Sequence, residues 1–140
     1  MHLRRALAQT YFVGYTFLAV CCHNSKCDWP GGEIQDFGTY CNGELTIRVA
    51  QVNGRLMFSV LDADSNIIIQ QNRNMSVYQH WGLFLDSSKN FWVFSSDIGH
   101  SVWEKDHKTG RYWERCFSRP LTRADVPQEI YDSRFVRFLN

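Results

Sequence analysis

The sequence of 140 residues lacks the features that identify several classes of protein. Its formal net charge is +1, so the chain as a whole has no strongly basic surface of the kind that binds nucleic acid. The apolar run Thr10–Cys22 is too short for a settled membrane-spanning helix. A chain of 140 residues can build one hydrophobic core but not two. We therefore expect one globular domain that binds no nucleic acid.

Common motifs of catalysis and of structural zinc are also missing. Ser95 and Ser96 lack the G-x-S-x-G turn that presents a hydrolase nucleophile. The pair Gly31-Gly32 has neither the spacing nor the lysine of a phosphate-binding loop. The five cysteines include no C-x-x-C pair, and the histidines are not spaced as in a zinc finger. We expect a protein without a cofactor, and catalysis is unsupported.

The N-terminus has the pattern of a targeting segment. Arg4 and Arg5 precede the apolar run, as the positive region of a secretory signal precedes its hydrophobic region. Residues 18–21 (LAVC) resemble the lipobox of bacterial lipoproteins, which implies a lipid on Cys21; cleavage after Cys21 by ordinary signal peptidase is the alternative. A buried first helix or strand is the other interpretation. We expect residues 1–22 to be a signal peptide or lipoprotein signal, residues 23–40 a linker, and residues 41–140 a single β-rich domain.

The cysteines agree with export to an oxidising compartment. Cys41 precedes the first clear strand and Cys116 lies near the end of the last one, so a bridge between them would tie the ends of the sheet together. Cys22 and Cys27 are left to form a second, small loop if Cys21 is lipidated. Spacing alone does not fix the connectivity.

The stretch Trp81–Phe117 carries the clearest structural signal. Its apolar, aromatic-rich runs are separated by polar turn clusters, which is typical of antiparallel strands in a meander. Asn53-Gly54 predicts a hairpin with a type I′ turn. Pro127–Phe138 has helical spacing and predicts a short amphipathic helix. We expect an all-β fold, an antiparallel meander of about seven strands that forms a small barrel or sandwich with this C-terminal helix. The strands are predicted at residues 43–49, 55–61, 67–71, 81–85, 91–96, 101–105 and 111–117.

Three turns share one pattern, in which Asp ends a strand and Asn or Gly follows four residues later. They are Asp62–Asn66, Asp86–Asn90 and Asp106–Gly110. The Asp is expected to cap its own turn, and Asn or Gly to supply the left-handed position. Residues 86–115 also resemble one blade of the sensor-type β-propeller repeats, but the chain is too short to close a propeller.

Aromatic side chains fall on both faces of the predicted strands. Neighbouring residues such as Tyr112 and Trp113 point to opposite faces, and a sheet with one solvated face should not carry aromatics on both. We interpret them as core beneath the C-terminal helix, as a cavity lining, or as an exposed binding patch. Nearby arginines would suit an acidic or saccharide partner. The candidate binding residues are Trp92, Phe94, Trp103, Tyr112 and Trp113, and the arginines are Arg111, Arg115, Arg119 and Arg123.

Asp97 and His100, with His80 close by, are candidates for a metal or acid–base site. Carboxylate and imidazole groups together can bind a metal or move protons. No second element visibly supplies the missing ligand, so the simpler interpretation is a turn at Gly99 with solvated polar residues.

The function expected from these patterns is that of an exported binding protein. The first hypothesis is a non-enzymatic inhibitor or immunity-like protein of the envelope or exterior, which occludes a protein partner through an aromatic surface. Small exported barrels with a disulfide, such as the lysozyme inhibitor lipoproteins, are similar in plan, although this chain lacks their S-G-x-x-Y loop. The membrane would be reached only through the N-terminus. The alternatives are a small-ligand carrier with an aromatic-lined barrel and a metal-dependent enzyme centred on Asp97 and His100.

Overall fold

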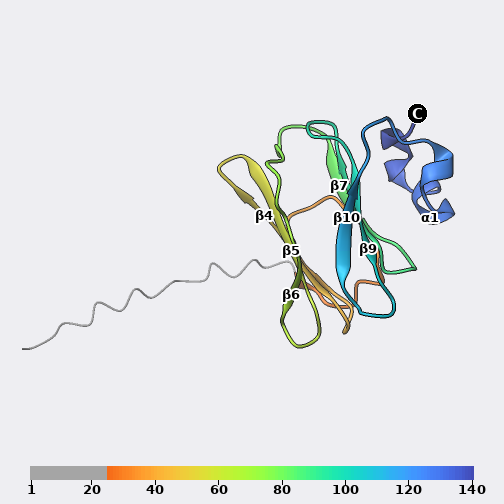
Figure 1. Cartoon of the computed structure of the whole chain (residues 1–140). Helices are drawn as coiled ribbons and strands as arrows, with labels where there is room; N and C mark the ends of the chain where they lie inside the picture. Colours follow the sequence, from red (N-terminus) through yellow and green to blue (C-terminus); the bar gives the residue numbers. More distant parts are fainter. Residues whose placement is uncertain (1–24) are drawn as a thin grey trace, which may run out of the picture.

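The computed structural model describes residues 25–140, which form two sheets packed face to face (Figure 1). The first, which we call sheet 1, has the strand order β1-β3-β4-β5-β6, and sheet 2 has the order β10-β9-β8-β7-β2. All pairs are antiparallel except β1 with β3. Sheet 1 contains β1 (Ser25–Lys26), β3 (Gly38–Cys41), β4 (Thr46–Val52), β5 (Arg55–Leu61) and β6 (Ile67–Gln70). Sheet 2 contains β2 (Gly32–Ile34), β7 (Trp81–Leu85), β8 (Phe91–Ser95), β9 (Ser101–Lys105) and β10 (Tyr112–Cys116).

The all-β prediction is confirmed, and the arrangement is a sandwich without a closed barrel. The seven predicted strands are β4 to β10. The alternating residues of facing strands meet in one core between the sheets, where the rings of Phe58 on β5 and Phe91 on β8 lie 5.5 Å apart. The predicted Asn53-Gly54 turn is present, with φ values of 50° and 74° at its two residues.

Residues 32–41 correct the expectation of a linker up to residue 40. They cross from one sheet to the other, because β2 pairs with β7 of sheet 2 and β3 pairs with β4 of sheet 1. Trp29, Ile34 and Tyr40 are buried in the core between the sheets. These strands are short and rich in glycine, which hid them in the sequence. The predicted signal at residues 1–22, with Cys21 and Cys22, lies outside the described residues.

The disulfide joins Cys27 to Cys41, so the predicted bridge from Cys41 to Cys116 is wrong. Cys27 and Cys41 have their Cα atoms 4.3 Å apart at the β1–β3 side of sheet 1. Cys116 lies on β10, at the edge of sheet 2 opposite to β2, and its thiol is free and exposed. A disulfide needs Cα atoms within about 7 Å, which the order of the strands does not allow for Cys41 and Cys116.

The repeated turns follow the predicted pattern with one difference. In the first two, the Asp side chain accepts the backbone N–H of the Asn four residues later, at 2.9 Å for Asp62 and 2.8 Å for Asp86. The left-handed residue is Ser65 or Lys89, one position before the Asn. In the third turn Gly110 has the positive φ of 71°, as expected.

Residues 117–139, which we call the C-terminal segment, cover β7, β8 and β9 on the outer face of sheet 2 (Figure 1). The predicted single helix is broken into α1 (Gln128–Tyr131) and the 3-10 turn η2 (Arg134–Phe138), after the 3-10 turn η1 (Arg123–Asp125). Ser133 causes the break, because its backbone is extended and its Oγ accepts the N–H of Phe135. In the part of the chain from residue 25 onward, no helix is long and apolar enough to cross a membrane.

Phe135 is the buried centre of this cover. Its ring lies 5.8 Å from the ring of Phe84 and 5.3 Å from that of Phe94. It also occupies the space above Gly82 on β7, where an added Cβ would be 2.5 Å from Phe135 Cζ. A glycine at this position in a buried strand is therefore explained by the close approach of a ring.

Candidate functional site

The five predicted binding aromatics lie in three different environments. Trp92 and Phe94 on β8 are 4% and 0% exposed, beneath the C-terminal segment. Trp103 and Tyr112 are half-buried and pack against the core between the sheets. Trp113 on β10 is 51% exposed. The structure does not gather these residues into one patch, and Trp113 is the one that a partner can reach directly.

The indole of Trp92 is held on several sides. Its Nε1–H donates to Asp86 Oδ2 at 2.9 Å, and its ring stacks with Phe94 and Phe117 at centroid distances of 6.2 and 6.0 Å. Asp86 is itself buried. Because the polar atom is satisfied and the ring is covered, Trp92 serves to join the C-terminal segment to sheet 2.

One side of the sandwich, which we call the seam, is where β6 and the residues after it lie beside β10. Residues 71–77, which we call the strap, continue from β6 along β5, where Leu56 N–H donates to Met75 O and Val77 N–H donates to Gly54 O. The strap contacts β10 of the opposite sheet through its side chains. It therefore closes one half of the seam, which we call the tied half.

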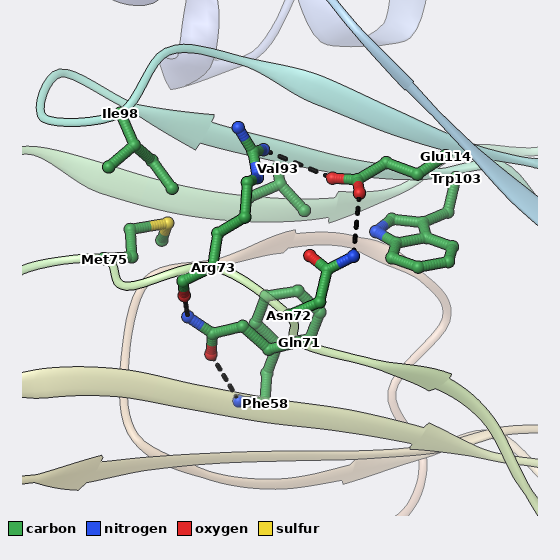
Figure 2. A pocket seen from close by; sticks show the side chains of 9 residues that line it. All are labelled: Phe58, Gln71, Asn72, Arg73, Met75, Val93, Ile98, Trp103 and Glu114. Carbon is green, nitrogen blue, oxygen red and sulfur yellow. Dashed lines mark hydrogen bonds and ion pairs between the residues drawn. The ribbon is translucent and has the colours of Figure 1, made fainter.

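Glu114 on β10 is the centre of the tied half of the seam (Figure 2). Its two carboxylate oxygens accept from Arg73 Nη2 at 3.2 Å and from Asn72 Nδ2 at 3.3 Å. The same Arg73 nitrogen donates to Ser101 Oγ at 2.9 Å. Gln71 fastens the base of the strap, because its Oε1 accepts the N–H of Phe58 and its Nε2 donates to the carbonyl of Arg73. The polar groups of the strap are thus satisfied by both sheets.

The cavity between the strap and the core is small. It has a volume of about 10 Å³, with Met75, Val93 and Trp103 among its lining residues. This is room for about one water molecule. Side chains fill the space between the sheets here, so this observation does not favour the small-ligand carrier.

The other half of the seam is open and forms a groove. Two adjoining hollows of about 440 and 320 Å³ share Ile68, Gly110 and Tyr112 as lining residues. Loops of sheet 1 bring acidic groups to the rim, and the end of β9 and two loops of sheet 2 bring basic groups. The acidic residues are Glu44, Asp62 and Asp64, and the basic residues are Lys89, Lys105 and Arg111.

Tyr112 forms the floor of the open half. Its hydroxyl donates to the carbonyl of Lys89 at 2.8 Å. Burial, with added repulsion from the carboxylates of Asp86 and Glu44, raises the pKa of Tyr112 to about 12. The phenol therefore stays protonated at neutral pH and keeps donating. Lys89 also forms an ion pair with Glu44 at 3.4 Å, which links the two sheets across the groove.

β10 forms one margin of this groove and is an edge strand. Its five residues pair with β9 in an unbroken antiparallel register. The other edge strands of the described residues are shorter: β1 has two residues, β2 has three and β6 has four. The register of β6 on β5 is also interrupted by a bulge between Val60 and Leu61. Short and bulged edges resist the addition of another strand, and β10 has neither protection.

The outer face of β10 carries alternating basic and aromatic side chains. Arg111, Trp113 and Arg115 are exposed, and Phe117 continues the row. Arg115 bonds to Glu104 at 2.6 Å and lies over the Phe117 ring at 4.7 Å. Arg111 has no ion pair within residues 25–140. The face is therefore positive around an exposed indole.

The predicted metal residues do not come together. Asp97 Oδ2 accepts the N–H of Ser76 at 3.0 Å and so fixes the end of the strap. The side chain of His80 is exposed, while its backbone pairs with Ser96. No three His, Cys, Asp or Glu residues are grouped to hold a metal ion anywhere in the described part of the chain. The geometry gives no support to a metal centre at Asp97 and His100.

His100 is held as a neutral hydrogen-bond acceptor. Its Nδ1 accepts the N–H of Ser95 at 3.1 Å, which places the ring proton on Nε2. Its ring lies between Phe94 and Phe138, at 5.5 and 5.7 Å, and burial lowers its pKa. It lines a shallow groove of about 370 Å³ between the β8–β9 turn and the C-terminal segment.

The sequence interpretation missed Arg73 and Glu114. Residues 72–79 are polar and lie between two predicted strands, and nothing local in the sequence indicates that they tie the two sheets. One signal was present: Glu114 is two residues from Tyr112, so the two side chains share one face of β10, and Tyr112 packs against the core between the sheets. A carboxylate on an inward face needs a cation or donor, and Arg73 supplies it.

Comparison of the chain with family models, curated proteins and solved structures found no match.

Proposed function

We propose that this chain is an exported, non-enzymatic binding protein that engages a protein partner through the β10 edge, meaning β10 together with the open half of the seam. The observation that carries the proposal is a five-residue edge strand, neither short nor bulged, with a half-exposed tryptophan at its second position. Exposed aromatic side chains with arginines beside them are typical of the residues that contribute most to protein interfaces. The aromatic surface is thus reduced from five residues to Trp113, flanked by Arg111 and Arg115.

Export is supported by the Cys27–Cys41 bridge, which is compatible with an oxidising compartment. The signal at residues 1–22 and the lipid on Cys21 complete the proposal on the basis of the sequence. In this proposal the partner lies in the envelope or the exterior. The membrane would be contacted only through the N-terminus.

Export is tested by the intact mass of the chain expressed with its own N-terminus in a bacterial host. We expect a shortened chain, with a diacylglyceryl group if Cys21 is the first residue, and a gain of two hydrogens for the Cys27–Cys41 bridge on reduction. An uncleaved chain with all of its thiols free would contradict export.

Partner binding is tested by affinity capture from envelope and secreted fractions of the organism that encodes the chain. Trp113→Asp should abolish the recovery of a stoichiometric protein partner. The matched control is Val52→Asp on β4, because Val52 is 53% exposed and Trp113 is 51% exposed. Circular dichroism establishes that both variants fold. Equal recovery of the same protein by both variants would place the interface elsewhere.

A further inference from the structure

The two sides of the β10 edge differ in chemistry, and this difference specifies what can bind there. We propose that the partner contributes an extended segment in which acidic and apolar residues alternate, and that this segment adds to sheet 2 as a strand beside β10. This inference rests on the proposed function and names the chemistry of the partner. Three features of the described residues support it: the free backbone groups, the outer face and the inner groove.

The free backbone groups of β10 belong to its even-numbered residues. Phe117 N–H donates to His100 O at 3.0 Å, and Asp106 N–H donates to Arg111 O at 2.8 Å, so the odd-numbered residues bond to β9. In an antiparallel pair the alternate residues point their N–H and C=O groups to the other side. Tyr112, Glu114 and Cys116 therefore present these groups beyond the edge of the sheet. An added strand would bond to them and gain main-chain affinity.

The outer face of β10 favours acidic residues in the added strand. Side chains of the new strand on this face would lie beside Arg111, Trp113 and Arg115. Arg115 is already bonded to Glu104, whereas Arg111 has no acidic partner among residues 25–140. A carboxylate next to Arg111 would form a charge-assisted bond. A second copy of β10 would bring its own arginines to this face, so an acidic segment fits better than self-association.

The inner side favours apolar residues at the alternate positions. Here the added strand would face the open half of the seam, where Ile67 is 59% exposed and Ile68 and Tyr112 are half-buried. Covering these side chains removes apolar surface from water. The strap prevents the same contact in the tied half, because Arg73 and Asn72 already occupy Glu114. The apolar residues of the segment should therefore lie over the N-terminal half of β10.

The test uses short synthetic peptides that alternate aspartate with valine, and the full chain labelled for NMR. We expect the aspartate peptide to bind and to slow amide hydrogen exchange at Tyr112, Glu114 and Cys116 by roughly tenfold or more at saturation. A lysine–valine peptide and an aspartate–valine peptide interrupted by proline are the matched controls and should not slow it. Binding should weaken as salt is raised, because exposed charges are screened.

Charge reversal at Arg111 gives a second measurement. Arg111→Glu should weaken binding of the aspartate peptide by about twofold to fivefold, the range of an exposed ion pair, and improve binding of the lysine peptide. Arg48→Glu, an exposed arginine on β4, is the control and should change neither. Arg111 takes part in no ion pair in the described residues, so its replacement leaves the packing intact.

Equal binding of acidic and basic peptides, or protection of amides away from β10, would overturn the proposed segment chemistry. A further outcome separates this inference from the proposed function. If Trp113→Asp abolishes capture of a protein partner while no alternating peptide binds, the β10 edge is an interface but the added acidic strand is wrong. If capture also survives Trp113→Asp, the proposed function fails first.

Discussion

Trp92 and Trp113 lie on the same outer face of sheet 2, and they have opposite environments. Trp92 is 4% exposed, with its indole nitrogen bonded to Asp86, whereas Trp113 is 51% exposed. The difference comes from the path of the chain after β10. The C-terminal segment leaves β10 at Phe117 and folds back over β7, β8 and β9, so the last strand is left uncovered. A tryptophan on this face is therefore part of the core where the C-terminal segment covers it, and part of the surface on β10.

This contrast separates stability from binding. The covered part of the face contains Phe84, Phe94 and Phe135 in direct ring contact. The uncovered part contains an indole between two arginines and no apolar cover. Substitutions in the covered part should reduce the free energy of unfolding, and substitutions in the uncovered part should leave it nearly unchanged and weaken only the proposed partner binding.

The largest expected effect is that of Phe135→Ala. Phe135 is fully buried, and its removal should lower the free energy of unfolding by about 3–5 kcal/mol, because a large cavity is left over Gly82. Trp113→Ala is the control on the same face and should change it by about 0.5 kcal/mol or less. Chemical denaturation followed by circular dichroism measures both. Equal losses would mean that the two halves of the face do not differ as described.

A smaller effect is expected for Gly82→Ala. The added methyl would meet Phe135 at 2.5 Å, so the ring must shift, at a cost of about 1–3 kcal/mol. Gly82 has no positive φ, so the cost is steric and not conformational. The double variant Gly82→Ala with Phe135→Leu should recover part of the loss that Gly82→Ala causes alone. Additive losses in denaturation experiments would show that the contact is not the cause.

The smallest effect concerns pH at the margin of the covered face. Burial lowers the pKa of His100 below its usual value of 6.5, so the unfolded chain takes up a proton at higher pH than the folded chain. The stability that neutral His100 contributes is therefore complete above pH 6.5 and is lost as the pH falls from 6.5 through the lower, folded pKa. Thermal unfolding between these limits should show a steeper decline for the wild type than for His100→Gln.

The control for this measurement is His107→Gln, on the exposed β9–β10 turn. An unchanged profile in His100→Gln would show that the bond from Ser95 N–H to the imidazole does not favour the neutral ring.

The strands could be predicted because alternation and turn residues are local signals. The runs from Thr46 to Cys116 contain both, and the seven predicted strands correspond to β4 to β10, although β4 begins and ends three residues later than predicted. β2 and β3 were missed, since a three-residue strand with glycine has no period to detect. The break in the predicted helix was missed for a different reason. The apolar residues of 127–138 have helical spacing, but the side chain of Ser133 bonds to the backbone of Ile130 and Phe135 in place of helical hydrogen bonds.

The site was harder to predict because it depends on which strand is at the edge. Alternation predicts that Trp92 and Trp113 lie in strands. It does not predict that Trp92 is covered and Trp113 is exposed. The disulfide failed for the same reason, since spacing does not reveal that Cys41 and Cys116 lie on opposite sides of the sandwich. The order in which strands pair is a long-range property. It determines that Trp92 is covered, that Trp113 is exposed, and that Cys41 and Cys116 are too far apart to form a disulfide.

The Cys27–Cys41 bridge has a mechanical consequence. A pull on the N-terminal end of the chain would first act on β1, which is held by only two residue pairs. It would then reach Cys27 and pass through a covalent bond to β3, within sheet 1. If the chain is anchored through its N-terminus, tension can detach β1 but then passes through the bridge into β3, so residues 28–40, with the three-residue strand β2, are shielded from the pull.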